Sequence, residues 1–384
     1  GSFRRGLDCG ERLVYIKDRK SGESYSPNRN YGRLPFEQFR CHVGLGYQKI
    51  VSVYNGLKVT FTLLVPDAGY AVLYLAEAEE LAGKERDLDL YFALRPQANL
   101  TVHTSYGSAD RDKEFGGLCY PHFSYQAETD YGCLYFASEH GFTSYCVSKG
   151  DFCGTYGSWE HPDGVAAQAL PSRGTTFEDD YVAAVSLPLR LGPREQKSFA
   201  FALAAGRSAA ESGALASSLA KTSVFYSQLA LQKEKNALYQ RVFRAEIPDP
   251  LLRSLGNTWL KRQLSLGKTW GRIYGKGFRD VMQDIAAFVS LDIPLARTRI
   301  LYALAKQYGN GNTIRMFEPD LLLPYNDGAA WIPATISAFL KESGDFGILE
   351  EIVPYLDGGE DSVLGHMVRG VEYLLGDLGS HGLV

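Results

Sequence analysis

Charged residues crowd against a core-like segment in the sequence 275–284. The decapeptide Gly-Lys-Gly-Phe-Arg-Asp-Val-Met-Gln-Asp runs directly into the apolar sequence Ile285–Val289. Charged side chains rarely enter a core without a partner, so this crowding requires an explanation. In a helix that starts here, Asp280 and Asp284 share one face and Arg279 lies on the next. The first turn then presents polar groups to a ligand such as a sugar; the alternative is a helix-start ion pair beside a solvated face.

A second candidate lies in the segment 315–333, which we predict to be a long loop closed by a helix that begins near Trp331. Asp327 stands just before that helix and close to Tyr325. An aspartate beside glycine is usual in a turn or at a helix N-cap. The functional alternative is a general acid at the mouth of a pocket, with the ring of Tyr325 stacked on a sugar.

Composition limits the class of protein. The chain has 384 residues and 45% hydrophobic content, enough for two or three domains that each have a core. Its net charge of -4 comes from 40 basic and 44 acidic residues without long runs, which offers no stripe for nucleic acid and no membrane anchor. No segment approaches the roughly 20 apolar residues of a membrane span, and the N-terminal sequence does not resemble a signal peptide. We therefore expect a globular cytoplasmic protein without nucleic-acid or membrane partners.

All six cysteines lie in the first 153 residues. They form no C-x-x-C pair and have no histidine at zinc-finger spacing, so we expect no metal site. Their even number is the only argument for disulfides, and we predict free thiols. The six are Cys9, Cys41, Cys119, Cys133, Cys146 and Cys153.

Residues 1–205 have the pattern of strands. Alternating apolar residues on both sides of Asn55-Gly56 predict a β-hairpin of Tyr47–Tyr54 and Leu57–Val65. Further strands are predicted at Leu13–Ile16, Leu88–Leu94, Gly132–Ser138 and Tyr181–Leu191. Many short strands with polar turns indicate an antiparallel β-sandwich domain.

The pattern becomes helical after Gly206. Residues 206–248 are rich in Ala, Leu, Lys, Gln and Glu, which predicts a helical linker. Residues 249–384 then contain helical patterns that suggest a helical bundle or toroid. About five helices are few for a toroid that closes on itself, so we expect this domain to be incomplete in the chain. The predicted helices are Leu251–Leu266, Asp280–Ser290, Leu295–Tyr308, Ile332–Lys341 and Ser362–Leu378.

Five separated motifs together resemble glycoside hydrolase family 94. This family contains inverting phosphorylases of cellobiose, chitobiose and β-1,2-linked oligoglucans, and the phosphorylase-like domain of cyclic β-1,2-glucan synthases. The resemblance runs from about Trp259 to the end, and His42–Tyr47 is similar to a stretch of the family's N-terminal sandwich. The motifs are Gly277-Phe278-Arg279-Asp280 with Gln283-Asp284, Pro294–Arg297, Tyr325-Asn326-Asp327 with Trp331, Glu342–Asp345 with Ile348–Glu351 and Pro354, and His381-Gly382-Leu383.

The resemblance implies a large β-sandwich, a helical linker and an (α/α)6 barrel. It also implies a reaction in which inorganic phosphate attacks a β-glucoside with inversion, giving α-glucose 1-phosphate and a shortened sugar without a cofactor. Phosphate is already a nucleophile, so only one carboxyl group is needed. Asp327 aligns with the family's general acid and Asp280 with the aspartate that binds the glucosyl unit, while Arg279, Asp284 and Tyr325 would support the site.

The chain departs from the cellobiose enzymes at two positions. Gly328 replaces a second aspartate after the acid, and Tyr274 replaces an arginine for which Arg272 is the nearest substitute. The patterns Gly-Lys-Gly-Phe-Arg-Asp and Tyr-Asn-Asp-Gly are more similar to the β-1,2-oligoglucan branch of the family. We therefore predict a β-1,2-glucooligosaccharide as substrate, with a cellobiose-type β-1,4 substrate as the alternative. The family's phosphate-binding residues follow its His-Gly-Leu motif, after which this chain has only Val384.

Two other classes of function remain open from the sequence. The chain could be a non-catalytic carbohydrate-binding or dimerisation fragment, because the family's sandwich also helps to form homodimers. It could also be a hydrolase that uses water in place of phosphate. Binding of glucan oligosaccharides without turnover distinguishes the first, and transfer of labelled phosphate into the product excludes the second.

Overall fold

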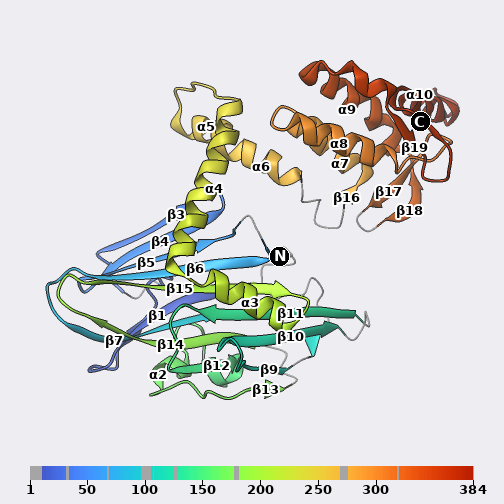
Figure 1. Ribbon diagram of the computed structural model, residues 1–384. Coiled ribbons are helices and arrows are strands. Elements are labelled where there is room, and N and C mark those ends of the chain that lie inside the picture. Colours follow the sequence, from blue (N-terminus) through green and yellow to red (C-terminus); the bar gives the residue numbers. More distant parts are fainter. Residues whose placement is uncertain are drawn as a thin grey trace. The chain divides into compact units, whose positions relative to one another are not determined.

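A computed structural model describes residues 11–31, 34–66, 69–96, 105–106, 108–124, 129–176, 181–268, 276–317 and 320–383 (Figure 1). The chain divides into two compact units, Gly1–Glu234 and Lys235–Val384. Within the described ranges, no helix combines the length and apolar character needed to cross a membrane.

The first unit is a sandwich of two antiparallel sheets (Figure 1), as the alternating pattern predicts. The smaller sheet has the strand order β12 (Ser144–Ser148), β14 (Tyr181–Leu191), β7 (Arg86–Leu94), β1 (Arg12–Asp18) and β2 (Ser24–Tyr25). The larger sheet has the order β13 (Thr175–Thr176), β9 (Ser108–Arg111), β10 (Leu118–Ser124), β11 (Thr129–Ser138), β15 (Gln196–Gly206), β6 (Ala71–Glu80), β5 (Leu57–Leu64), β4 (Tyr47–Tyr54) and β3 (Gln38–Val43), and β8 (Ser105–Tyr106) pairs with β10.

The predicted Asn-Gly hairpin joins β4 and β5. Tyr54 pairs with Leu57, and the two turn residues Asn55 and Gly56 have φ values of 48° and 65°. Two consecutive positive φ angles are those of a type I′ turn, whose twist matches that of the flanking strands. This turn sets the register, so the apolar residues of β5 face the core.

Side chains from both sheets meet in one hydrophobic core. The ring of Phe92 on β7 lies 5.6 Å from Phe61, 5.1 Å from Tyr74 and 4.8 Å from Phe201, centroid to centroid, all three on the larger sheet. These four side chains are buried. Each phenylalanine removed from water contributes roughly 1.5–3 kcal/mol, so this contact between sheets accounts for much of the sandwich's stability.

Helices cover the outer faces of the sandwich. The pair α3 (Ala209–Leu219) and α4 (Thr222–Val242) places Ala216 and Phe225 against Tyr135 and other residues of the larger sheet. On the smaller sheet, α1 (Lys149–Cys153) and α2 (Asp163–Ala166) pack through Phe152 and Val165. The segment after Gly206, predicted as a linker, is helical, and α3 also completes an outer layer of the sandwich.

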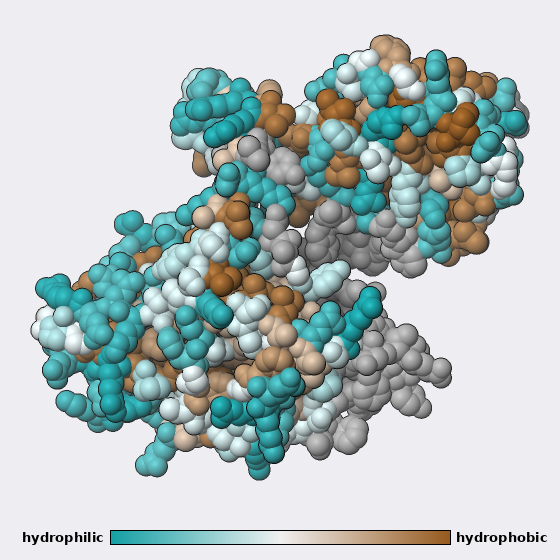
Figure 2. All heavy atoms as spheres, viewed as in Figure 1, coloured by the Kyte–Doolittle hydropathy of each residue, from teal (hydrophilic) through white to brown (hydrophobic). Residues whose placement is uncertain are grey.

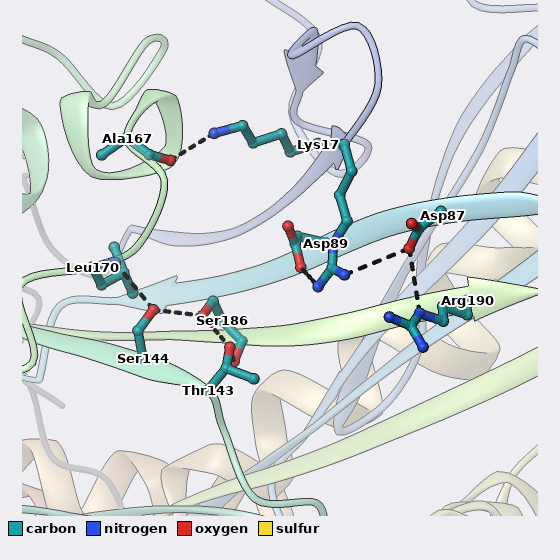
Figure 3. Close-up of polar contacts among 10 residues, drawn as sticks. Lys17, Asp87, Asp89, Thr143, Ser144, Ala167, Leu170, Ser186 and Arg190 are labelled. Carbon is teal, nitrogen blue, oxygen red and sulfur yellow. Dashed lines mark hydrogen bonds and ion pairs between the residues drawn. The ribbon is translucent and has the colours of Figure 1, made fainter.

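Polar contacts fasten the loop around α2 to the smaller sheet (Figure 3). Ser144 Oγ lies 2.7 Å from Ser186 Oγ on the neighbouring strand and accepts the backbone N–H of Leu170 at 3.0 Å. Lys17 Nζ donates to the carbonyl oxygen of Ala167 at 2.6 Å. Each buried polar group left without a partner would cost about 1–3 kcal/mol, so these bonds allow the loop to lie on the sheet.

Glu80, at the end of β6, is a fully buried carboxylate. It accepts backbone N–H groups from Ala82 at 2.9 Å, Gly83 at 2.6 Å and Lys84 at 3.2 Å, and Arg86 Nη2 lies 3.3 Å away. Burial alone raises the pKa of Glu80, but the backbone hydrogen bonds outweigh burial and lower the pKa to about 2. The charge of this carboxylate is therefore part of the folded sandwich.

The second unit is mainly helical. Side-chain oxygens of Asp249, Asp292 and Ser362 accept backbone N–H groups and cap the helices α5, α8 and α10. The elements are α5 (Pro250–Ser254), a π-helical turn (Leu255–Trp259), α6 (Leu260–Gly267), β16 (Lys276–Gly277), α7 (Phe278–Phe288), α8 (Ile293–Leu304), β17 (Thr313–Phe317), β18 (Leu321–Tyr325), α9 (Asp327–Ser343), a 3-10 turn (Phe346–Glu350), β19 (Ile352–Pro354), β20 (Glu360–Ser362) and α10 (Val363–Gly376).

The core of this unit lies between α7, α8 and α9 and includes Met282, Ile300 and Ile336. The helix α10 also carries large apolar residues that are exposed, and their spacing of three and four residues places them on one face. Figure 2 shows apolar surface in the part of the helical unit where α10 lies. The exposed residues are Leu364, Val368, Val371 and Leu375, and Leu378 is exposed just beyond the end of α10.

Candidate functional site

Two helices begin at the same edge of a small sheet. The strand β16 leads directly into α7, and β18 leads into α9. Both strands pair antiparallel with β17, which lies between them, so β16 and β18 run parallel. Both lead into a helix in the direction of the Thr313 end of β17, β16 from a position opposite Met316 and β18 from a position opposite Thr313. Thr335 Oγ1 of α9 donates to the carbonyl oxygen of Met282 in α7 at 3.0 Å and holds the helices together. The positive ends of both helix dipoles therefore lie at this edge.

The structure corrects two local predictions about the segment 315–333. Its first part is not a long loop, because residues 313–317 and 321–325 form the strands β17 and β18. The following helix begins at Asp327 rather than near Trp331, so Asp327 is the first helical residue and Asn326 is the N-cap. Pro333 lies inside α9.

Arg279 and Asp327 meet across this edge. Arg279 Nη1 donates to Asp327 Oδ2 at 2.6 Å, and the two side chains are 51% and 36% exposed. An ion pair this exposed contributes about 0–1 kcal/mol to stability, so holding the fold together does not account for it. Its effect is to hold a carboxylate at the start of α9 beside a cation at the start of α7.

Asp280 and Asp284 lie on another face of α7, as the helical spacing predicts. Both line a small pocket that opens to solvent. The same pocket is lined by the cations Lys268, Lys276 and Arg299, which belong to α6, β16 and α8 or their ends. The pocket therefore combines two carboxylates with three cations. No spacing in the sequence relates the three cations, which is why sequence reasoning missed them.

Two glycines make room at the starts of the helices. A Cβ atom on Gly277 would lie 2.6 Å from Asp280 Oδ2, so the Asp280 carboxylate folds back toward the N-terminus of α7. A Cβ atom on Gly328 would lie 2.0 Å from Thr313 Oγ1 and 3.1 Å from Phe278. Position 328 is therefore confined by β17 and α7, which explains why this fold has glycine directly after Asp327.

A hydrogen-bond network ties the start of α9 to α10. Asn326 does not cap α9 with its side chain. Instead, Asn326 Nδ2 donates to Asp377 Oδ2 at 2.7 Å, and Tyr373 OH donates to Asn326 Oδ1 at 2.9 Å. Asn312 Nδ2 donates to Tyr373 OH at 2.8 Å. Tyr325 is 48% exposed, and Arg315 lies over its ring at 5.6 Å. The sequence analysis missed Tyr373 and Asp377, since both lie about fifty residues from the segment they hold.

The structure brings Arg279 together with Asp327, and Asp280 together with Asp284, around the first turns of α7 and α9. Arg272, the remaining predicted binding residue, lies outside the described residues, as does Tyr274. Within the described ranges, no group of three or more His, Cys, Asp or Glu side chains is arranged to hold a metal ion. An exposed carboxyl beside a polar pocket and two helix N-termini can donate a proton and bind hydroxyl-rich or anionic ligands.

Comparison with known families assigns both units. The model of the glycosyl hydrolase 94 supersandwich domain matches residues 6–222, and the model of the glycosyl hydrolase 94 superfamily catalytic domain matches residues 239–384. The chain therefore belongs to glycoside hydrolase family 94. This confirms the resemblance drawn from the motifs.

Individual relatives agree with this assignment. A solabiose phosphorylase from Paenibacillus borealis is 29% identical over 381 residues, which are 98% of this chain and 49% of the relative. The cyclic beta-(1,2)-glucan synthase NdvB from Rhizobium meliloti (strain 1021) is 23% identical over 356 residues, which are 90% of this chain and 12% of that protein. The chain spans about half the length of the curated phosphorylases it matches.

A solved structure supports the fold. The crystal structure of a bacterial glucoamylase complexed with acarbose superimposes with a TM-score of 0.56 at 13% identity and covers 96% of this chain and 62% of that one. Together with the family models, this likeness confirms the predicted fold class, an antiparallel sandwich followed by helices of the (α/α)6 barrel type.

Proposed function

We propose that the intact gene product is an inverting glycoside phosphorylase that uses Asp327 as its general acid. Inorganic phosphate attacks the anomeric carbon of a terminal β-glucosyl residue, and Asp327 protonates the departing glycosidic oxygen. The products are α-glucose 1-phosphate and a shortened sugar. The observation that carries the proposal is the position of Asp327 at the start of α9, 2.6 Å from Arg279, in a chain of family 94.

The remaining residues have binding roles in this proposal. Asp280 accepts hydrogen bonds from hydroxyl groups of the glucosyl unit, and Asp284 and Arg279 support that subsite. Tyr325 and Arg272 complete the binding residues. Phosphate is already a nucleophile, so the reaction needs neither a second carboxyl as a base nor a cofactor. The two carboxylates and three cations around the pocket favour a ligand that is polar and rich in hydroxyl groups.

The ion pair imposes an order on the proposed steps. Asp327 paired with Arg279 is a carboxylate, whereas a general acid must carry a proton. The pair must therefore open, and Asp327 must take up a proton, before the glycosidic bond breaks. Phosphate entering near Arg279 would compete for the guanidinium and release Asp327 from the ion pair.

The test measures phosphate release by the intact gene product supplied with α-glucose 1-phosphate and a panel of acceptor sugars, together with the reverse reaction. Asp327→Asn should lower the rate by about 10²–10⁴-fold. Asp320→Asn is the matched control, because Asp320 is also 36% exposed and also pairs with a cation, Lys306, at 2.6 Å. A rate for Asp327→Asn within tenfold of that of Asp320→Asn would remove Asp327 from the role of acid.

The substrate proposed is a β-1,2-glucooligosaccharide. It is supported by the Gly-Lys-Gly-Phe-Arg-Asp and Tyr-Asn-Asp-Gly patterns and by the similarity to NdvB, whose name includes beta-(1,2)-glucan. A panel of β-1,2-, β-1,3- and β-1,4-linked disaccharides with phosphate distinguishes this substrate from a cellobiose-type one. Proton NMR identifies the anomeric configuration of the sugar phosphate that is formed. An α product from a β-glucoside establishes inversion.

Other parts of the assignment also stand as proposals. The domain boundaries are 1–205 for the sandwich, 206–248 for the linker and 249–384 for the barrel portion. The family models end and begin at residues 222 and 239, both within α4, and expression of the two matched parts as separate polypeptides tests the boundaries. A homodimer and a cytoplasmic location follow from the family resemblance and the sequence alone, and light scattering and cell fractionation test them.

A further inference from the structure

Two cysteines on neighbouring strands of the larger sheet place their sulfur atoms close together. Cys119 of β10 pairs with Tyr135, and Cys133 of β11 pairs with Pro121. The two cysteines are therefore diagonal neighbours on the same face of the sheet. Their Sγ atoms are 3.1 Å apart. The pairing of β10 with β11 becomes irregular just after Pro121, next to this position.

The two thiols differ in their surroundings. Cys133 is 5% exposed, whereas Cys119 is only partly buried. The hydrogen bond from Cys119 lowers the pKa of Cys133, and a hydrogen bond from Ser212 of α3 adds to this effect. The same contact raises the pKa of Cys119, which keeps its proton. A thiolate next to a thiol is the pair that reacts with oxidants, since the thiolate is the nucleophile and the thiol can resolve the product.

We propose that Cys119 and Cys133 form a reversible dithiol–disulfide site that small hydroperoxides oxidise and trivalent arsenicals bridge. The Cys133 thiolate attacks a peroxide oxygen; the O–O bond breaks, the alcohol leaves with a proton, and Cys133 becomes a sulfenic acid. The Cys119 sulfur then attacks the Cys133 sulfur, and water leaves. Two thiols and one hydroperoxide give one disulfide, one alcohol and one water, and the two electrons lost by the sulfurs reduce the peroxide.

The geometry also makes the disulfide easy to reduce. A disulfide bond is about 2.05 Å long, so the sulfur atoms must approach by roughly 1 Å. Diagonal neighbours are farther apart than directly opposed residues, and closing this gap strains the two strands. Strained disulfides have higher reduction potentials and belong to the labile, reversible class.

The bond would tie together a part of the sandwich that also supports α3. Cys133 lies in β11, which α3 crosses (Figure 1). Closing the chain between residues 119 and 133 removes conformations from the unfolded state. Oxidation should therefore shift the urea midpoint of the first unit, and dithiothreitol should return it to its starting value. This inference does not depend on the catalytic proposal.

The experiment treats the intact chain with one equivalent of tert-butyl hydroperoxide at pH 7.5 and maps the disulfides by mass spectrometry. Digestion at Asp and Glu is required, because trypsin leaves positions 119, 133 and 146 in one peptide. We expect a cross-linked peptide pair joining residues 119 and 133 that dithiothreitol separates. Stable sulfinic acid on either cysteine, or a bond to any other cysteine, would overturn the proposal.

Phenylarsine oxide gives a second measurement on the reduced chain. One equivalent should bind per chain, and Cys119→Ser and Cys133→Ser should each weaken that binding by more than tenfold. Cys41→Ser is the control, because Cys41 is an exposed free thiol on β3 and should leave binding unchanged. Binding that survives Cys133→Ser contradicts the proposal. The disulfide map of the unaltered chain decides the question if a variant does not fold.

Discussion

Gly328 provides a sharp test of the geometry that places Asp327. A methyl group at this position would lie 2.0 Å from Thr313 Oγ1, well inside a normal contact, and both residues are buried. Adding a methyl group to a packed interior costs about 1–3 kcal/mol, while alanine gains up to about 1 kcal/mol over glycine in a helix. We therefore expect Gly328→Ala to destabilise the helical unit by about 1–2 kcal/mol.

The partner variant removes the obstacle. In a Thr313→Ala background the clashing hydroxyl is gone, while contacts of 3.1 Å to the Cβ atom of residue 313 and to Phe278 remain, so adding Gly328→Ala should cost less than it does in the unaltered chain. The coupling energy of this double-mutant cycle should then be at least about 0.5 kcal/mol. Gly376→Ala is the matched control: it is also a helical glycine, with no atom within 4 Å of the new Cβ, and should change stability by less than about 0.5 kcal/mol.

The assay must read the helical unit separately from the sandwich. Urea unfolding followed by hydrogen exchange of peptides from α7 and α9 does so, because each unit then reports its own transition. A stability for Gly328→Ala equal to that of the unaltered chain would refute the close packing of α9 on β17. An equal cost in both backgrounds would refute Thr313 as the obstacle.

Three further predictions concern stability. The pKa of Glu80 is about 2 in the folded chain and 4.5 ordinarily, so the Glu80 carboxylate contributes fully to folding stability above pH 4.5, and this contribution is lost as the pH falls toward 2. Glu80→Gln should flatten this part of the pH–stability curve measured by urea unfolding. Arg279→Ala should cost at most about 1 kcal/mol in the same assay, because its ion pair is exposed; a loss above 2 kcal/mol would mean that the pair is structural. Phe339→Ala, at a fully buried site, should cost about 3–5 kcal/mol, whereas Leu375→Ala, at a site 61% exposed, should change thermal stability little; similar effects for both would contradict the assigned core.

Much of the fold follows from local pattern. The alternation around Asn55-Gly56 predicts the β4–β5 hairpin, because only a two-residue turn with positive φ angles keeps both apolar faces on one side. Tyr181–Leu191 is predicted with the bounds that the structure has. The predicted start of α9, near Trp331, is wrong by four residues, because the helix begins at Asp327. Pairing of β17 with β18 brings the chain to Asp327 already in position to begin a helix, and no local signal reports that pairing.

The sequence by itself determined the division into a part rich in strands and a part rich in helices, the family to which the chain belongs, and the two short segments that carry its acidic candidates. These depend on residue types at short spacing, which the chain displays directly. Only the tertiary structure decided which charges meet. Arg279 and Asp327 are 48 positions apart, and they pair because β16 and β18 run parallel and lead α7 and α9 toward the same end of β17. The approach of Cys119 to Cys133 likewise depends on the register of two strands. Contacts of this kind follow from pairing and packing over the whole unit, which local spacing does not specify.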